Sequence, residues 1–245
     1  LEQPIENAVN ESWSEELELL KAALRSDAER ELEPYVADVS EANPDQIPFS
    51  DLWLPAIDAA VARLRSSLVD LQHRRVDDEV YLSLGRSLLI RLSRISEQVL
   101  FEQFNLQRPP GAMLLAHLGS DGDGEGPPVR EYYEKFIREL RSDGLNSLLE
   151  TFPVLGRFLG QVSFDWHHSN EKLLRRIEAD TVPLQQTFGV KPAMVLAGVH
   201  QGLSDPHNHG QVVSILRFVS VDATSTVRVV YKPKDMRVDL VYQRA

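Results

Sequence analysis

The sequence predicts an α+β fold that is mainly α-helical, because the spacing of its apolar residues changes along the chain. Up to about residue 190, apolar residues recur at intervals near 3.6, as they do on one face of a helix. After that point they partly alternate with a period of 2 and are often β-branched, as in half-buried strands. We therefore predict a helical domain over residues 1–190 and the start of an antiparallel β lobe over residues 191–245.

The composition limits the classes of protein to which the chain can belong. The chain has 37 acidic and 26 basic side chains and a formal charge of −11, which argues against broad binding to nucleic acid. It has no cysteine, so it cannot form disulfides, and we predict a cytoplasmic location. No apolar run reaches about 18 residues, so no membrane span is expected.

The helices are predicted from apolar spacing and from the residues that begin or end a helix. A capping-box pattern at Ser12–Glu15 predicts a first helix from residue 13 to about Glu33, ended by Pro34. A second helix should begin after Ser50. Further helices are expected over residues 77–106, 129–140, 145–150 and 153–179, the last with Pro153 in its first turn.

Two other groups of polar residues are interpreted as surface features. Residues 119–128 form an acidic, glycine-rich stretch whose D-x-D-x-E spacing matches part of a calcium loop, but the remaining ligand pattern is missing. His167 and His168 are adjacent, so on a helix they point in different directions and cannot form the i, i+4 pair that binds zinc. We predict a surface loop, surface or packing histidines, and no metal site held by the chain itself.

Three strands are predicted after residue 190. Residues 194–199 form the first strand, and residues 211–219 and 227–232 form a hairpin across the polar turn Asp222–Ser225. A helix is expected to follow from Asp235.

Polar residues of specific chemistry gather around this hairpin. Before it come Asp205, His207, Asn208, His209 and Gly210, and Lys232 ends its second strand. Each has an ordinary interpretation, since a lysine at a strand end is commonly solvated and Asp-Pro or Asn-His-Gly commonly forms a turn. Together, imidazoles, a carboxylate and an ammonium beside one hairpin indicate a site for a phosphate or a metal.

The same residues resemble a known family. Residues 203–213, LSDPHNHGQVV, followed by VYKPK at 230–234 and by Asp239, resemble the dehydratase domain of class II lanthipeptide synthetases (LanM type). That family has D-x-H, a glycine, a strand, a turn, a strand ending Y-K-P-R, and a helix. Residues 152–159, FPVLGRFL, are similar to the family's YPVLARLL helix, and residues 132–149 to the helix before it. The resemblance extends over roughly residues 48–245.

The resemblance implies a kinase-like β lobe and an activity. Family members use ATP and Mg²⁺ to phosphorylate Ser and Thr of a precursor peptide, and then eliminate the phosphate to leave dehydroamino acids. Lys232 matches the lysine to which the family assigns contact with the nucleotide phosphates. Asp205 and His207 match the D-x-H pair implicated in elimination, without an assignment of acid and base. Asn208, His209 and Gly210 would form the turn that faces the phosphate.

The chain departs from the family pattern in two residues and in extent. Gln211 stands where the family usually has arginine, and Lys234 replaces the arginine of Y-K-P-R. The resemblance implies a C-terminal kinase-like lobe beyond Ala245, and also a cyclase domain, which needs cysteine and histidine zinc ligands. We therefore expect a fragment that is inactive alone.

The alternative is a stand-alone helical module that binds a peptide or partner and keeps a degenerate hairpin. A gene that continues past Ala245 would favour the first interpretation.

Overall fold

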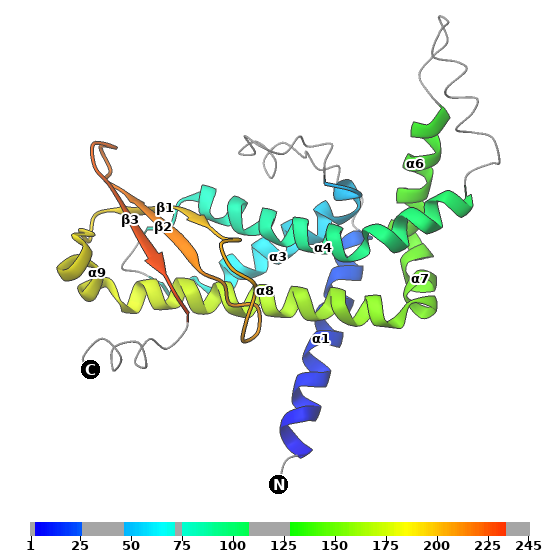
Figure 1. The fold of residues 1–245 in the computed structure, drawn as a ribbon, viewed down its shortest axis with the longest axis horizontal. Helices are drawn as coiled ribbons and strands as arrows, with labels where there is room; N and C mark the ends of the chain where they lie inside the picture. The colour runs from blue at the N-terminus through cyan, green and yellow to red at the C-terminus, as the bar shows by residue number, and fades with distance from the viewer. Residues whose placement is uncertain (1–2, 26–46, 72–74, 108–127, 234–245) are drawn as a thin grey trace, which may run out of the picture. The chain divides into compact units, whose positions relative to one another are not determined.

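A computed structural model describes residues 3–25, 47–71, 75–107 and 128–233 (Figure 1). The described part is mainly helical and ends in a three-stranded antiparallel sheet, which confirms the predicted fold class. Residues 119–127 of the acidic loop and the helix expected from Asp235 lie outside the described residues. Among the described residues, no helix is both long enough and apolar enough to cross a bilayer.

Most helices lie where apolar spacing predicts them. α3 spans Ser50–Ser67, α4 spans Asp78–Gln107, and α8 spans Pro153–Ala179 with Pro153 as its first residue. The predicted gap between helices at residues 141–144 is a π-helical turn, η3, so α6 (Pro128–Glu139) continues through it into α7 (Leu145–Thr151).

The predicted start of the first helix is wrong. α1 spans Gln3–Leu24, so the Ser12–Glu15 pattern lies inside the helix and does not cap it. Pro4 lies in the first turn of α1, where its missing N–H costs no intrahelical hydrogen bond. A capping box is a local pattern, and a serine in the middle of an uninterrupted helix, such as Ser12, nine residues after Gln3, can match it by composition alone.

Contacts divide the chain into two compact units. Unit 1 comprises Leu1–Ala60 and Leu88–Phe164, and unit 2 comprises Val61–Ser87 and Asp165–Ala245. The divisions therefore fall within α3, α4 and α8. The change from helix to strand falls between α9 (Thr181–Phe188) and β1 (Val195–His200), beside the boundary predicted at residue 190.

Unit 1 has a helical core in which aromatic rings meet. Phe49 and Phe104 each contact Tyr133 and Phe136, with ring centroids 5.4–6.2 Å apart. The Tyr133 hydroxyl donates a 2.5 Å hydrogen bond to an Asp51 carboxylate oxygen, and burial raises the pKa of Tyr133. These contacts fix α6 against the start of α3.

A proline inside α3 is accommodated by an arginine. Pro55 has no N–H, so the carbonyl of Asp51 loses its i+4 donor. The guanidinium of Arg141, in η3, donates to that carbonyl instead. The carbonyl oxygen of Asp51 thus receives its hydrogen bond from a residue 90 positions away in the sequence.

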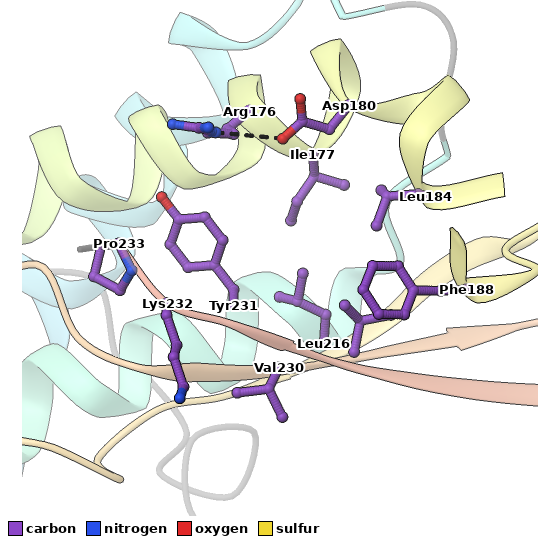
Figure 2. A pocket seen from close by; sticks show the side chains of 11 residues that line it. Arg176, Ile177, Asp180, Leu184, Phe188, Leu216, Val230, Tyr231, Lys232 and Pro233 are labelled. Carbon is purple, nitrogen blue, oxygen red and sulfur yellow. Dashed lines mark hydrogen bonds and ion pairs between the residues drawn. The ribbon is translucent and has the colours of Figure 1, made fainter. Parts of the chain in front are cut away.

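Unit 2 contains the sheet, in the order β1-β2-β3, with β2 at Ser214–Val219 and β3 at Thr226–Tyr231. The three predicted strands and the hairpin are confirmed, but β2 begins three residues after its predicted start at residue 211. One face of the sheet is buried, through Leu196, Val199, Leu216, Phe218 and Val229. Figure 2 shows this side: Leu216 and Tyr231 point toward α8 and α9, among Ile177 and Leu184. The outer edge of β1 is met by residues 75–77, where Leu196 exchanges backbone hydrogen bonds with Arg75 and Asp77.

His167, on α8 in unit 2, should make the stability of the fold depend on pH. Its side chain is buried, and burial lowers the pKa of His167 from 6.5 to about 4; the Arg63 cation also lowers it, while the Glu171 carboxylate opposes the shift and His168 adds to it. Between these two pH values the unfolded chain binds a proton at this imidazole and the folded chain does not. The contribution of the neutral imidazole to stability is therefore complete above about pH 6.5 and is lost as the pH falls toward about 4.

We expect the free energy of unfolding to fall by roughly 2–3 kcal/mol more between about pH 7 and about pH 4.5 in the wild type than in His167→Gln. Urea denaturation at a series of pH values measures this difference. The matched control is His168→Gln, which removes the exposed neighbouring imidazole. His168 makes the smallest contribution to the pKa shift of His167, so this variant should keep most of the wild-type slope. Equal pH slopes for the wild type and His167→Gln would show that His167 does not carry the effect.

Candidate functional site

The loop that carries the D-x-H motif and the lysine that follows β3 lie at the same end of the sheet. β1 ends at His200, opposite Ile215 near the start of β2, and Ser214 pairs with Tyr231 at the end of β3. The loop over residues 201–213 connects β1 to β2 at this end, and Lys232 comes directly after β3. The pairing therefore brings together residues that are some 25 positions apart in sequence.

The first residue of the 201–213 loop is tied to α8 by a chain of hydrogen bonds. The side-chain amide of Gln201 donates to Asn170 at 2.9 Å, and the amide of Asn170, which is 1% exposed, donates to the carbonyl of Trp166 at 2.8 Å. The indole N–H of Trp166 donates to the carbonyl of Leu84, on α4, at 2.9 Å. Because these polar groups are buried or half-buried, losing one partner leaves another unsatisfied, so the chain holds the loop firmly.

Further hydrogen bonds join residues within the 201–213 loop itself. The backbone N–H of Val213 donates to the Ser204 hydroxyl at 3.0 Å, which joins the two ends of the loop. Nearer the tip, His207 and Gln211 exchange backbone hydrogen bonds of 2.9 and 2.8 Å. Asn208, His209 and Gly210 form the turn between them.

The turn has a backbone conformation that favours glycine and asparagine. φ is +43° at Asn208, +61° at His209 and +77° at Gly210. At Gly210 space is limited as well, because a Cβ atom there would lie 2.9 Å from the Cβ atom of Asp165 and 3.1 Å from its carbonyl oxygen. The tip of the loop therefore rests directly on α8, and Gly210 is required for that approach.

Asp165 also faces the side chain of His209. A carboxylate oxygen of Asp165 lies 3.7 Å from Nδ1 of His209, so the two attract each other when the imidazole is protonated. The separation is too long for a hydrogen bond. Asp165 therefore packs against Gly210 and also makes an electrostatic contact with His209.

The predicted site residues are accessible to solvent. Asp205, His207, Asn208 and His209 are exposed, Gly210 is half-buried, and Lys232 is exposed. Figure 2 shows Lys232 and Val230 on the side of β3 away from α8, while Tyr231 points toward it. The strand alternation thus turns the ammonium group toward the face of the sheet that points away from α8.

The geometry suits contact with a phosphate better than it suits a metal ion held by this chain. An exposed ammonium and two exposed imidazoles can donate to phosphate oxygens. Asp205 is the one carboxylate of the 201–213 loop, and within the described ranges no group of three or more His, Asp or Glu side chains could hold a metal ion. These residues therefore do not fit a protein-held Mg²⁺ site, and we assign them no chemistry through one.

Sequence patterns alone did not identify several residues that build the site. Asn170, Gln201 and Asp165 position the 201–213 loop, yet none belongs to a recognisable motif. Asn170 had one local signal: it lies four residues after Trp166, and so on the apolar face of the predicted helix. A polar side chain on such a face commonly has a buried partner.

A groove lies on the other side of β3, toward α8 and α9 (Figure 2). Its volume is about 720 Å³, and Arg176 and Asp180 form an ion pair of 3.3 Å at its rim. Phe188 is 51% exposed beside it. Lys232 is among the residues that line the groove, although Figure 2 shows its side chain pointing away from α8.

Comparison with protein families identifies a domain in the second part of the chain. The family described as "Domain of unknown function (DUF4135)" matches residues 152–245, from the last residue before α8 to Ala245. The matched segment contains the D-x-H loop, the three strands and Lys232. No curated protein matches the chain significantly. The match covers less than half of the chain, and its description assigns no activity.

Proposed function

We propose that the chain is part of a class II lanthipeptide synthetase dehydratase, which phosphorylates Ser and Thr of a precursor peptide with ATP and then eliminates the phosphate. The observation that carries the proposal is the joint position of two motifs. The D-x-H loop and the Y-K-P lysine, which the resemblance links in sequence, are brought to one end of one sheet by the pairing of Ser214 with Tyr231.

Phosphorylation requires stabilisation of negative charge. The hydroxyl oxygen of the peptide bonds to the γ-phosphorus and gives up its proton, which is released to solvent, while the bond to the β-phosphate oxygen breaks and ADP leaves. In this proposal Lys232 contacts the nucleotide phosphates, where its charge offsets the charge that spreads over the phosphoryl oxygens. ATP supplies the phosphoryl group when it is bound.

Elimination requires a base and assistance to the leaving group. A base removes the proton from Cα of the phosphorylated residue, the Cβ–O bond breaks, and inorganic phosphate leaves as the Cα–Cβ double bond forms. Asp205 and His207 are proposed to serve this step, because an exposed carboxylate and imidazole two residues apart can accept a proton and donate to a phosphate. Their division of roles stays open.

The partners follow from the same proposal. The precursor peptide is the substrate, a second kinase-like lobe completes the nucleotide site, and a cyclase domain is a further partner. The alternative, a helical module that binds a peptide without modifying it, makes a different prediction about the product.

The proposal is tested by the mass of a precursor peptide after incubation with the natural protein that contains this chain. With ATP, we expect the peptide to lose one water for each modified Ser or Thr. With an ATP analogue whose γ-phosphate cannot be transferred, the mass should not change. A peptide that binds but keeps its mass in the presence of ATP would favour the binding module and contradict the dehydratase.

A further inference from the structure

Hydrogen bonds close the 201–213 loop on each side of the D-x-H motif. Before the motif, the hydroxyl of Ser204 accepts a 3.0 Å hydrogen bond from the backbone N–H of Val213, nine positions later. At the end of the motif, His207 and Gln211 exchange their backbone hydrogen bonds. The motif therefore begins directly after one closure of the loop and ends on the other.

The backbone between the two closures has little freedom. Asp205 and Pro206 are the two residues that separate Ser204 from His207. The proline ring fixes φ at position 206 and also restricts the residue before it to an extended conformation. Because both ends are held and the middle is restricted, the backbone presents the two side chains of the motif in one relative placement.

This placement depends on the backbone and not on contacts of the side chains themselves. Among the described residues, none forms a hydrogen bond or ion pair with the carboxylate of Asp205 or the imidazole of His207. Both residues are exposed. Whatever holds the backbone of the loop therefore also decides where these two groups lie.

The hydroxyl of Ser204 is the side-chain group on which the first closure depends. The second closure is made by backbone groups alone, which a change of side chain leaves in place. Without the hydroxyl, the half-buried N–H of Val213 would lose this acceptor, which is unfavourable. The segment before His207 would then be held only at Gln201, and it would include Gly202, whose φ of +94° shows the conformational freedom of glycine.

We propose that Ser204 is a positioning residue for elimination, whose hydroxyl closes the loop and so fixes the Asp205 carboxylate relative to the His207 imidazole. The inference rests on the proposed function for the reaction. Elimination needs a base at Cα and a donor at the departing phosphate of the same residue, so the two groups must keep one separation. Phosphoryl transfer, in which Lys232 contacts the nucleotide, does not depend on that separation.

The test compares Ser204→Ala with Ser204→Thr in the natural protein, by single-turnover mass spectrometry of the precursor peptide with ATP. Ser204→Ala should slow elimination by about ten- to a hundredfold, because small misplacements of reacting groups have effects of this order. The rate of phosphoryl transfer should be unchanged, so phosphorylated peptide accumulates. Ser204→Thr keeps the hydroxyl and should restore the dehydrated product.

Ser220→Ala is the matched control. The hydroxyl of Ser220 accepts a 2.9 Å hydrogen bond from the backbone N–H of Ser225, so it makes the same kind of closure in the β2–β3 turn, at the opposite end of the sheet. This variant should give the wild-type product. Hydrogen exchange of fragments that contain Val213 should be faster in Ser204→Ala than in the wild type, and thermal unfolding verifies that each variant is folded.

Several results would overturn the inference. Dehydrated peptide from Ser204→Ala at the wild-type rate would do so and would leave the proposed function standing. Equal slowing of both half-reactions, or equal slowing of elimination by Ser204→Ala and Ser220→Ala, would give Ser204 a general structural role. Equal loss of elimination in Ser204→Ala and Ser204→Thr would show that the hydroxyl is not the group responsible.

Failure of the proposed function is recognised separately, from the wild type. If the wild type yields no dehydrated peptide, the proposed function fails, and the role of Ser204 in elimination fails with it. Faster exchange at Val213 in Ser204→Ala would still establish that the hydroxyl closes the loop.

Discussion

Replacement of Lys232 by methionine should abolish dehydration of the precursor peptide by the natural protein. In the proposed mechanism the ammonium of Lys232 stabilises charge on the transferring phosphoryl group, and loss of one such contact costs on the order of 10²–10³ in rate. Methionine keeps an unbranched side chain, and Lys232 is exposed after the end of β3, so the fold should be unaffected. Single-turnover product mass and thermal unfolding measure the two effects separately.

Lys191→Met is the matched control for this experiment. Lys191 is exposed and precedes β1, so it lies at the end of the sheet opposite the 201–213 loop. The control should retain the wild-type rate. If Lys232→Met also dehydrates the peptide at the wild-type rate with an unchanged melting temperature, Lys232 takes no part in the mechanism.

Replacement of His207 by alanine should separate the two half-reactions. If His207 serves elimination, the variant still consumes ATP and transfers the phosphoryl group, so a phosphorylated peptide should accumulate. Its mass is higher than that of the unmodified peptide by one phosphoryl group for each modified residue, whereas the wild-type product is lighter by one water for each. Mass spectrometry of the product therefore distinguishes the two steps directly.

Other products from the His207→Ala variant would contradict a role in elimination, and each would point to a different role. Unmodified peptide from His207→Ala would place His207 in phosphoryl transfer or in folding, and fully dehydrated peptide at the normal rate would remove it from the reaction. A packing role predicts a lower melting temperature with both half-reactions reduced alike. His168→Ala, which removes an exposed imidazole of α8, is the control and should give the wild-type product.

Local patterns predicted most of the fold. The bounds of α3, α4 and α8 and the β2–β3 hairpin follow from apolar spacing, which depends on neighbours a few residues apart. The failures were also local. The Ser12–Glu15 pattern predicts a helix start that falls inside α1, and the break predicted at residues 141–144 is the π-helical η3, through which the chain stays helical.

The sequence by itself determined which chemical groups are present: the D-x-H motif, the following glycine, and a lysine after an apolar strand. The tertiary structure decided how they are placed. The pairing of Ser214 with Tyr231 brings the loop and Lys232 to one end of the sheet, the contact with Asp165 explains the glycine at position 210, and the Gln201–Asn170 hydrogen bond anchors the loop. Each of these contacts joins residues at least 17 positions apart, and such pairs leave no periodic signal because their spacing is set by the path of the chain and not by the geometry of a helix or a strand.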